Sequence, residues 1–403
     1  MTQPAPKRYA YSLIKHFIIV ALFFPTFYSY YNNEYYQDLF FSNIIAFFFF
    51  LNIIRKWTID FKRNQLFVIL LSILLLLYNL VSIYNFTAYD VYFWKMYPVN
   101  ITIAFLFFLC LLQVRDHKDI VNDKVIKLMI YSIIVHTLLG FHYRLHNGSR
   151  LFMMNFRYTK TMINPDNEFF CWMYHDASEY ALILILSMAF FIIYRDYFHN
   201  LWTYAFSQII LLIALYLTNS KTFYMCAVIL LGFQLVQYCI QKYKIEKKYI
   251  LYSFPITISL GFIVAYFLLK NVNTFQTKWQ IWKGNWEILL HDHLGLRTAF
   301  GVLKYNVPNV ELPLNQAHNV FLNHMLRYSI PVGILFTLMF LSIIFFSFLK
   351  KPNYLTLGIW IAVLIPMNMD NALETLHLPY VLFMIYCIFF RRDENIKVKG
   401  DIN

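Results

Sequence analysis

Long apolar blocks recur along this chain of 403 residues, and they constrain its fold more than any other sequence feature. Each block is roughly 17–22 residues long, the length that a helix needs to cross the hydrocarbon core of a bilayer. Of all residues, 60% are hydrophobic and only 14% are charged, whereas soluble domains carry about a quarter charged residues. The sequence therefore predicts an all-α polytopic membrane protein and argues against a soluble helical domain.

Counting the apolar blocks predicts about twelve transmembrane helices in a single domain spanning residues 1–403. The expected helices are 12–29, 38–54, 66–84, 97–113, 125–142, 178–194, 201–218, 222–241, 249–269, 320–348, 354–368 and 377–390. Basic residues gather in alternate connectors, such as 242–248 and 350–351, that all fall on one side. This positive-inside pattern predicts that both termini are cytoplasmic. The net charge of +13 is thus an orientation signal, and no nucleic-acid partner is expected.

Two connectors, residues 143–177 and 270–319, are much longer than the others and fall on the opposite, non-cytoplasmic side. Connections between packed helices are usually short, so loops of this size tend to be functional or to carry their own small structure. Both loops hold basic residues that depart from the positive-inside rule. These include Arg150, Arg157, Lys278 and Arg297. An anionic ligand is the simplest cause for positive charge on this outer side.

A polar cluster around His318 lies where the second loop re-enters the membrane, within the run Asn315-Gln316-Ala317-His318-Asn319. Imidazole titrates near neutral pH, so a histidine at this place can take a proton from an alcohol. It can equally anchor a helix end at the membrane interface. The residues alone leave both interpretations open.

The run from Ala317 to Leu322, with Gly333 downstream, resembles the O-antigen ligase and O-antigen polymerase superfamily. The family pattern there is a histidine–asparagine pair, an apolar residue and leucine, and then a glycine in the next helix. Three more stretches resemble family segments in the same order along the chain. They are the polar loop at 149–167, the helix-end step at 218–221, and the basic-residue-and-tryptophan segment at 278–282 with the glycine-containing turn that follows it.

The resemblance implies a bacterial inner-membrane glycosyltransferase that takes a glycan from undecaprenyl diphosphate at the periplasmic face. It implies no metal and no other cofactor, and inversion at the anomeric carbon. His318 is the implied general base, with Asn319 and Trp282 in support. For an O-antigen ligase, the leading interpretation, the acceptor is lipid A-core. For a repeat-unit polymerase, the alternative, it is another lipid-linked glycan. The basic first loop favours the ligase because lipid A-core carries phosphates.

The resemblance also assigns the donor diphosphate to two cations, Lys221 and Lys278, where the family has arginine. Lysine keeps the positive charge but lacks the planar fork that binds two oxygens at once. Arg297, Arg150 and Arg157 are therefore further candidates for this role. The competing interpretation of Lys221 is a lysine that extends from a tight turn to reach water.

Other residues have alternative interpretations. His291 and His293 lack a third ligand at a diagnostic spacing, and His318 and His324 do not share a helix face, so no metal site is expected. Tryptophans at helix ends either anchor the protein at the membrane interface or stack on sugar rings. These are Trp279, Trp282 and Trp286. Four carboxylates at outer helix ends are either interfacial or orient sugar hydroxyls, namely Asp176, Glu179, Asp370 and Glu374.

The alternative from another functional class is a flippase for lipid-linked oligosaccharides, or another transporter. Such a protein would more commonly show charges inside the membrane along a cavity, and short loops. Here the apolar blocks are almost free of charge, and the polar content lies in the two long loops. The sequence therefore favours the glycosyltransferase.

Overall fold

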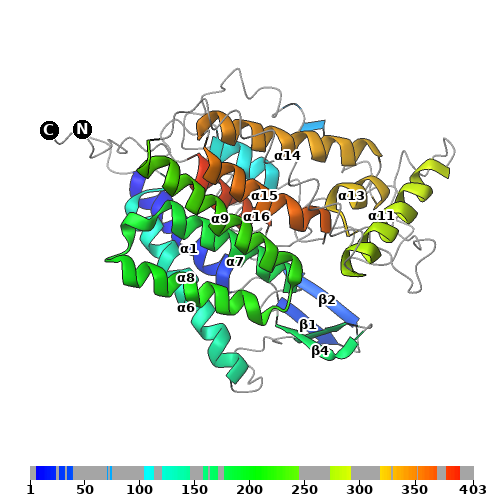
Figure 1. Cartoon of the computed structure of the whole chain (residues 1–403), viewed down its shortest axis with the longest axis horizontal. Coiled ribbons are helices and arrows are strands. Elements are labelled where there is room, and N and C mark those ends of the chain that lie inside the picture. Colours follow the sequence, from blue (N-terminus) through cyan, green and yellow to red (C-terminus); the bar gives the residue numbers. More distant parts are fainter. Residues whose placement is uncertain are drawn as a thin grey trace.

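The computed structural model is a bundle of helices with two small hairpins (Figure 1). It describes residues 6–23, 27–31, 34–39, 70, 73–74, 104–112, 120–145, 158–161, 164–170, 177–244, 273–291, 318–327, 330–351, 353–369 and 378–390. Most of the predicted helices 38–54 and 66–84, and all of 249–269, lie outside the described residues.

The described helices confirm the predicted helical class. They are α1 (Pro6–Phe23), α6 (Asp123–Leu145), α7 (Ala177–Ile193), α8 (Leu201–Leu217), α9 (Lys221–Lys242), α11 (Asn273–His291), α13 (Val320–Arg327), α14 (Ile330–Lys350), α15 (Tyr354–Met369), α16 (Leu378–Phe389) and the 3-10 helix η3 (Arg195–Tyr197). Residues 104–112 are also helical. Helices α7, α8, α9, α15 and α16 match their predicted ranges to within one residue at each end.

The single helix predicted over 320–348 is wrong, because the chain forms α13 and α14 there. Pro331 is the second residue of α14. Proline has no backbone N–H, so it fits only in the first turn of a helix, where that N–H would have no partner in any case. The proline therefore starts a new helix and cannot continue the previous one.

Two antiparallel hairpins accompany the helices. Strand β1 (Phe27–Tyr31) pairs with β2 (Glu34–Leu39), and β3 (Tyr158–Thr161) pairs with β4 (Asn164–Phe170). The first hairpin corrects the prediction that a helix runs to residue 29 and that the next begins at 38. Its tyrosine-rich strands favour extended backbone. The second hairpin lies inside the predicted loop 143–177.

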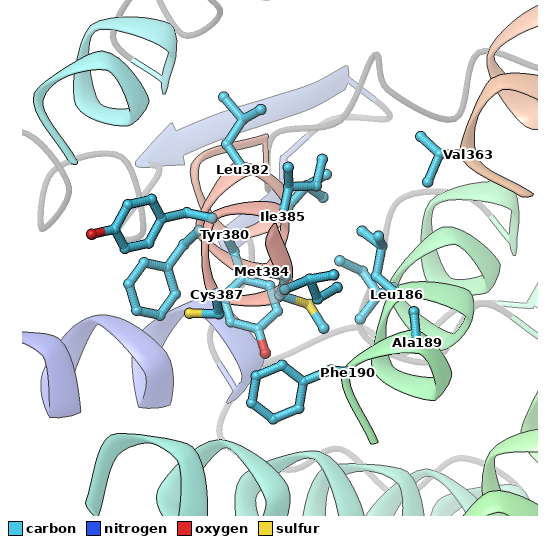
Figure 2. Packing of buried hydrophobic residues seen from close by; sticks show 14 of the residues in the cluster. Leu186, Ala189, Phe190, Val363, Tyr380, Leu382, Met384, Ile385 and Cys387 are labelled. Atoms are coloured by element: carbon cyan, nitrogen blue, oxygen red, sulfur yellow. The ribbon is translucent and has the colours of Figure 1, made fainter. Parts of the chain in front are cut away.

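Helices α7 and α16 form the centre of the bundle. All 12 residues of α16 are buried, and nearly all of α7 is buried as well. A helix that is apolar on every side is suited to this position. Figure 2 shows side chains of α16, such as Tyr380 and Met384, gathered with Leu186 and Phe190 of α7 and Val363 of α15.

The outer helices expose apolar side chains in continuous stripes. On α8 the stripe is Trp202, Phe206, Ile209, Ile213 and Tyr216, and on α14 it is Ile334, Leu338, Leu341, Phe345 and Leu349. Their spacing of three and four residues places each set on one helix face. Soluble monomers rarely expose long apolar faces. Stripes of this kind are compatible with a helical membrane protein.

Helix length gives a more limited indication of membrane spans. Among the described residues, two helical segments are long and apolar enough to cross a membrane, Asp123–Phe141 and Lys221–Lys242. Six more apolar helices have 10–17 residues and are shorter than a typical membrane-spanning helix. The count of about twelve crossings stays a prediction.

Hydrogen bonds between distant residues define one end of the bundle. Tyr197 donates its hydroxyl to Asp123 Oδ1 at 2.6 Å, which joins η3, just after α7, to the start of α6. Tyr194 donates its hydroxyl to the carbonyl of Cys387 at 2.5 Å, which joins the end of α7 to the end of α16. The start of α6 and the ends of α7 and α16 therefore lie together.

The same end includes α9, α14 and α15. Lys351 Nζ donates to the carbonyl of Ile388 at 3.0 Å, and the backbone N–H of Tyr354 donates to Gln237 Oε1 at 3.2 Å. These contacts add the end of α14, the start of α15 and the end of α9. Most of the described basic connector residues belong to these helix ends. They are Lys124, Lys127, Arg195, Lys242, Lys244, Lys350 and Lys351. We call this the basic end of the bundle.

Helices α9 and α15 run antiparallel and approach closely. Tyr354 meets Gln237, and four residues further along α15 a Cβ on Gly358 would lie 2.4 Å from the Cβ of Phe233. Continuing this antiparallel register brings Lys221, the first residue of α9, to the level where α15 ends. We call this the far end of the bundle; it is about 21 Å from the basic end at 1.5 Å per residue.

Candidate functional site

The backbone at His318 has a positive φ of 46°, an uncommon conformation for a residue other than glycine. The next residue, Asn319, caps α13 by accepting the N–H of Leu322 on its Oδ1 at 3.0 Å. Such a cap satisfies one of the N–H groups that a helix start leaves without a partner. The histidine is therefore held on a tight turn at the entrance to α13.

The side chain of Lys278 reaches this turn from α11. Its Nζ lies 2.8 Å from His318 Nδ1, and the contact is partly buried. An ammonium group has only hydrogens to donate, so with Lys278 charged His318 Nδ1 is the acceptor. In the neutral ring the proton is then on Nε2. The structure thus brings together two residues to which the sequence pointed independently.

A second contact ties the same turn to α15. Asn319 Nδ2 donates to Asn368 Oδ1 at 2.9 Å, and Asn368 Nδ2 donates to the carbonyl of Leu364 at 2.8 Å. Asn368 lies in the last turn of α15, at the far end of the bundle. Asn368 is not among the candidates that the sequence motifs indicate. The signal that could have identified it is an amide close to the end of an otherwise apolar helix.

Lys221 is exposed at the first position of α9, just after a tight turn. In that turn Asn219 has a positive φ of 53°, and the side chain of Ser220 makes no capping hydrogen bond. The start of a helix carries partial positive charge, so a lysine there gains nothing from the helix dipole. An anion bound at this place would meet both the lysine and the helix start. The antiparallel register of α9 and α15 brings Lys221 to the same end as His318, but no contact joins the two residues.

The three tryptophans of α11 divide between two faces of the helix. Trp279 and Trp286 are about half exposed, at 55% and 51%, and Leu290 lies on the same face. Trp282 lies four residues after Lys278, on the face that carries the lysine, and is partly buried. Its Nε1 is buried and has no hydrogen-bond partner among the described residues. The supporting role of Trp282 that the resemblance implies stays a prediction.

Gly333 and His324, which follow the turn at His318, have packing roles. Gly333 lies where α14 crosses α13, and a Cβ there would lie 2.7 Å from the backbone nitrogen of Met325. Only glycine permits so close an approach of the two helices. His324 stacks on Phe336, with ring centroids 4.2 Å apart, and its Nδ1 donates to the carbonyl of Val320 at 2.7 Å. His324 thus fixes α13 against α14.

The structure describes only some of the other candidate residues from the sequence. Arg150, Arg157 and Arg297 lie outside the described residues, as do Asp176, Asp370, Glu374 and His293. Glu179 is buried in the first turn of α7. Among the described residues, no group of three or more His, Cys, Asp or Glu side chains could hold a metal ion. The expectation of no metal site stays a prediction.

No known protein family model matches the chain, and no curated protein matches it either.

Proposed function

We propose that this chain is a membrane-embedded glycosyltransferase. It transfers a glycan from undecaprenyl diphosphate to an acceptor hydroxyl, with His318 as the base. The observation that carries the proposal is the 2.8 Å contact between Lys278 Nζ and His318 Nδ1. Transfer from a lipid diphosphate needs a base for the acceptor and a cation for the leaving group. The contact brings a histidine and a lysine, residue types that can fill these two roles, side by side from segments 40 residues apart.

The contact also suggests the order of events. While Lys278 donates to His318 Nδ1, that nitrogen cannot take a proton. The two negative charges of a diphosphate attract the lysine more strongly than a neutral imidazole does. Binding of the donor then draws Lys278 to the leaving group and frees Nδ1 for the acceptor hydroxyl. The acceptor oxygen bonds to the anomeric carbon, the bond to the diphosphate breaks, and the proton passes to His318.

The membrane setting is part of the proposal. The apolar stripes of α8 and α14 support lipid contact, because lipid accepts apolar side chains that water does not. Clustering of lysines at the basic end supports a cytoplasmic position for that end and a periplasmic one for the site. Trp279 and Trp286 on α11 are residues of the type found at the membrane–water interface. An inner-membrane, multi-pass protein accounts for all three features.

Within this class we favour an O-antigen ligase that uses lipid A-core as acceptor, with the repeat-unit polymerase as the alternative. The surface polysaccharide of a deletion strain distinguishes them. Full-length chains that stay on undecaprenyl diphosphate and never reach lipid A indicate a ligase. Single repeat units attached to lipid A indicate a polymerase. Loss of the surface polysaccharide together with lipid-linked glycan that stays in the cytoplasmic leaflet would instead indicate a flippase.

The first prediction concerns the base. His318→Ala and His318→Gln should both abolish detectable glycan transfer, because base catalysis contributes roughly 10²–10⁴ in rate and glutamine cannot accept a proton at neutral pH. The measurement is glycan transfer in the complemented deletion strain, with protein level and membrane insertion checked by immunoblot. Transfer at the native rate by His318→Gln would show that the histidine only orients its neighbours.

A further inference from the structure

We infer that Asn368 is a positioning residue for His318, acting through Asn319, and this role in catalysis rests on the proposed function. The inference starts from three segments that meet at one point. They are α11 with Lys278, the turn at residues 318–319, and the last turn of α15 with Asn368. Helix α15 packs against α7 and α9, so Asn368 gives the turn an anchor in the bundle in addition to the packing of α13 on α14.

The side-chain oxygen and nitrogen of both Asn319 and Asn368 each take part in a hydrogen bond. Asn319 accepts the N–H of Leu322 on Oδ1 at 3.0 Å and donates Nδ2 to Asn368 Oδ1 at 2.9 Å. Asn368 in turn donates its Nδ2 to the carbonyl of Leu364 at 2.8 Å. Each amide can satisfy these contacts in only one orientation, because oxygen accepts and nitrogen donates. The chain of contacts therefore fixes the rotation of Asn319 relative to α15.

This fixed rotation matters for His318 because the histidine is the preceding residue and has a φ of 46°. A backbone in this sparsely populated region persists only where the surroundings hold it. The cap holds the turn to α13, the crossing at Gly333 holds α13 to α14, and the bond to Asn368 ties the turn itself to α15. Without Asn368 the turn would lose this last restraint, and the contact between His318 Nδ1 and Lys278 would loosen.

Asn368 also fixes the position of His318 relative to Lys221. Helix α15 packs closely along α9, and their register brings the end of α15 level with Lys221. Asn368 thus links the turn with His318 to the helix that lies beside the second candidate cation. The separation between base and cation depends on this link, whereas the fold of α15 itself does not need the bond to Asn319.

The test compares Asn368→Leu with Asn368→Asp and with Asn353→Leu in the full-length protein, purified in detergent. Leucine has a similar size but removes both hydrogen bonds, whereas aspartate keeps the oxygen that accepts from Asn319. Asn353 is the matched control, since it caps the opposite end of α15 by accepting the N–H of Thr356 at 2.8 Å. The probe is diethyl pyrocarbonate, and mass spectrometry of the peptide that contains His318 gives the modification rate of its ring.

We expect Asn368→Leu to change the modification rate of His318 by about fivefold or more, the effect of losing one hydrogen bond to a partly buried group. Asn368→Asp and Asn353→Leu should stay within about twofold of the native protein. With undecaprenyl-diphosphate-linked oligosaccharide as donor, Asn368→Leu should lower kcat by about tenfold or more and leave KM nearly unchanged. Asn368→Asp should restore most of that loss.

An unchanged His318 rate in Asn368→Leu would overturn the positioning role. Equal changes in Asn368→Leu and Asn353→Leu would do the same, because they would reflect general loosening of α15. If the native protein transferred no glycan, the proposed function would fail, but the modification rates would still decide whether Asn368 positions His318.

Discussion

At the scale of residues, the two candidate cations have different surroundings. Lys278 is partly buried and contacts His318, whereas Lys221 is exposed at the start of α9. Lys278 therefore combines two roles in the proposed reaction, holding His318 before the donor binds and stabilising the leaving group afterwards. Lys221 has only the second role available to it. Substitutions at the two positions should differ accordingly.

The second prediction tests this difference. Lys278→Ala should lower glycan transfer by roughly 10²–10³, the usual cost of removing a group that stabilises transition-state charge, and Lys221→Ala should cost less. Arginine at either position should keep substantial activity because charge matters more than shape at these sites. The matched control is Lys283→Ala, which removes an exposed lysine from the same helix as Lys278. Native activity in both alanine variants would move the diphosphate to the arginines of the loops.

At the scale of elements, the position of the site depends on the crossing of α13 and α14. Gly333 allows the backbones of the two helices to come close at Met325, and the stacked rings of His324 and Phe336 hold them there. The start of α13 is the cap at Asn319, so any shift of α13 moves the turn that carries His318. Gly333, which belongs to the next helix, therefore helps to set the position of His318.

The third prediction tests this crossing. In Gly333→Ala the new Cβ would lie 2.7 Å from the backbone nitrogen of Met325 and 2.8 Å from its Cα, and backbone atoms cannot give way without moving α13. We expect a loss of about 1–3 kcal/mol in the free energy of unfolding, seen as a lower melting temperature, and reduced glycan transfer. Gly232→Ala is the control, since a Cβ there meets nothing within 4 Å. Equal behaviour of the two variants would contradict the role of the crossing.

At the scale of the whole molecule, the basic end and the far end carry different kinds of residue. One end gathers the basic connectors, and the other gathers His318, Asn368 and the start of α9. Figure 1 shows α11, α13 and the hairpins together at one end of the long axis. If the chain spans a membrane as proposed, the positive-inside rule predicts that the site lies outside the cytoplasm.

The fourth prediction tests this orientation with single cysteines. Lys283→Cys on α11 should react with an impermeant thiol reagent in intact spheroplasts, whereas Lys244→Cys, just past the end of α9, should react only after the membrane is opened. Both residues are exposed. The background should carry Cys171→Ser, since Cys171 belongs to the predicted loop 143–177. The reverse labelling pattern would refute both the topology and a periplasmic site.

Within the described residues, the sequence by itself predicted the bounds of five helices and pointed to the two residues at the centre of the candidate site, but it left α11 inside a predicted loop. Apolar blocks mark helices because burial of apolar side chains, in lipid or in a core, depends mainly on local composition. For this reason α7, α8, α9, α15 and α16 lie where the blocks predict. His318 and Lys278 were identified from local runs of polar residues and their resemblance to a family pattern.

Only the tertiary structure decided which residues meet. Lys278 and His318 are 40 residues apart, and Asn319 and Asn368 are 49 apart, so their contacts depend on how whole helices pack. The break before Pro331 and the hairpin at residues 27–39 were also missed, because apolar content alone does not distinguish a continuous helix from two short ones or from a tyrosine-rich hairpin. Helix packing sets distances between remote residues, and no local pattern in the chain encodes those distances.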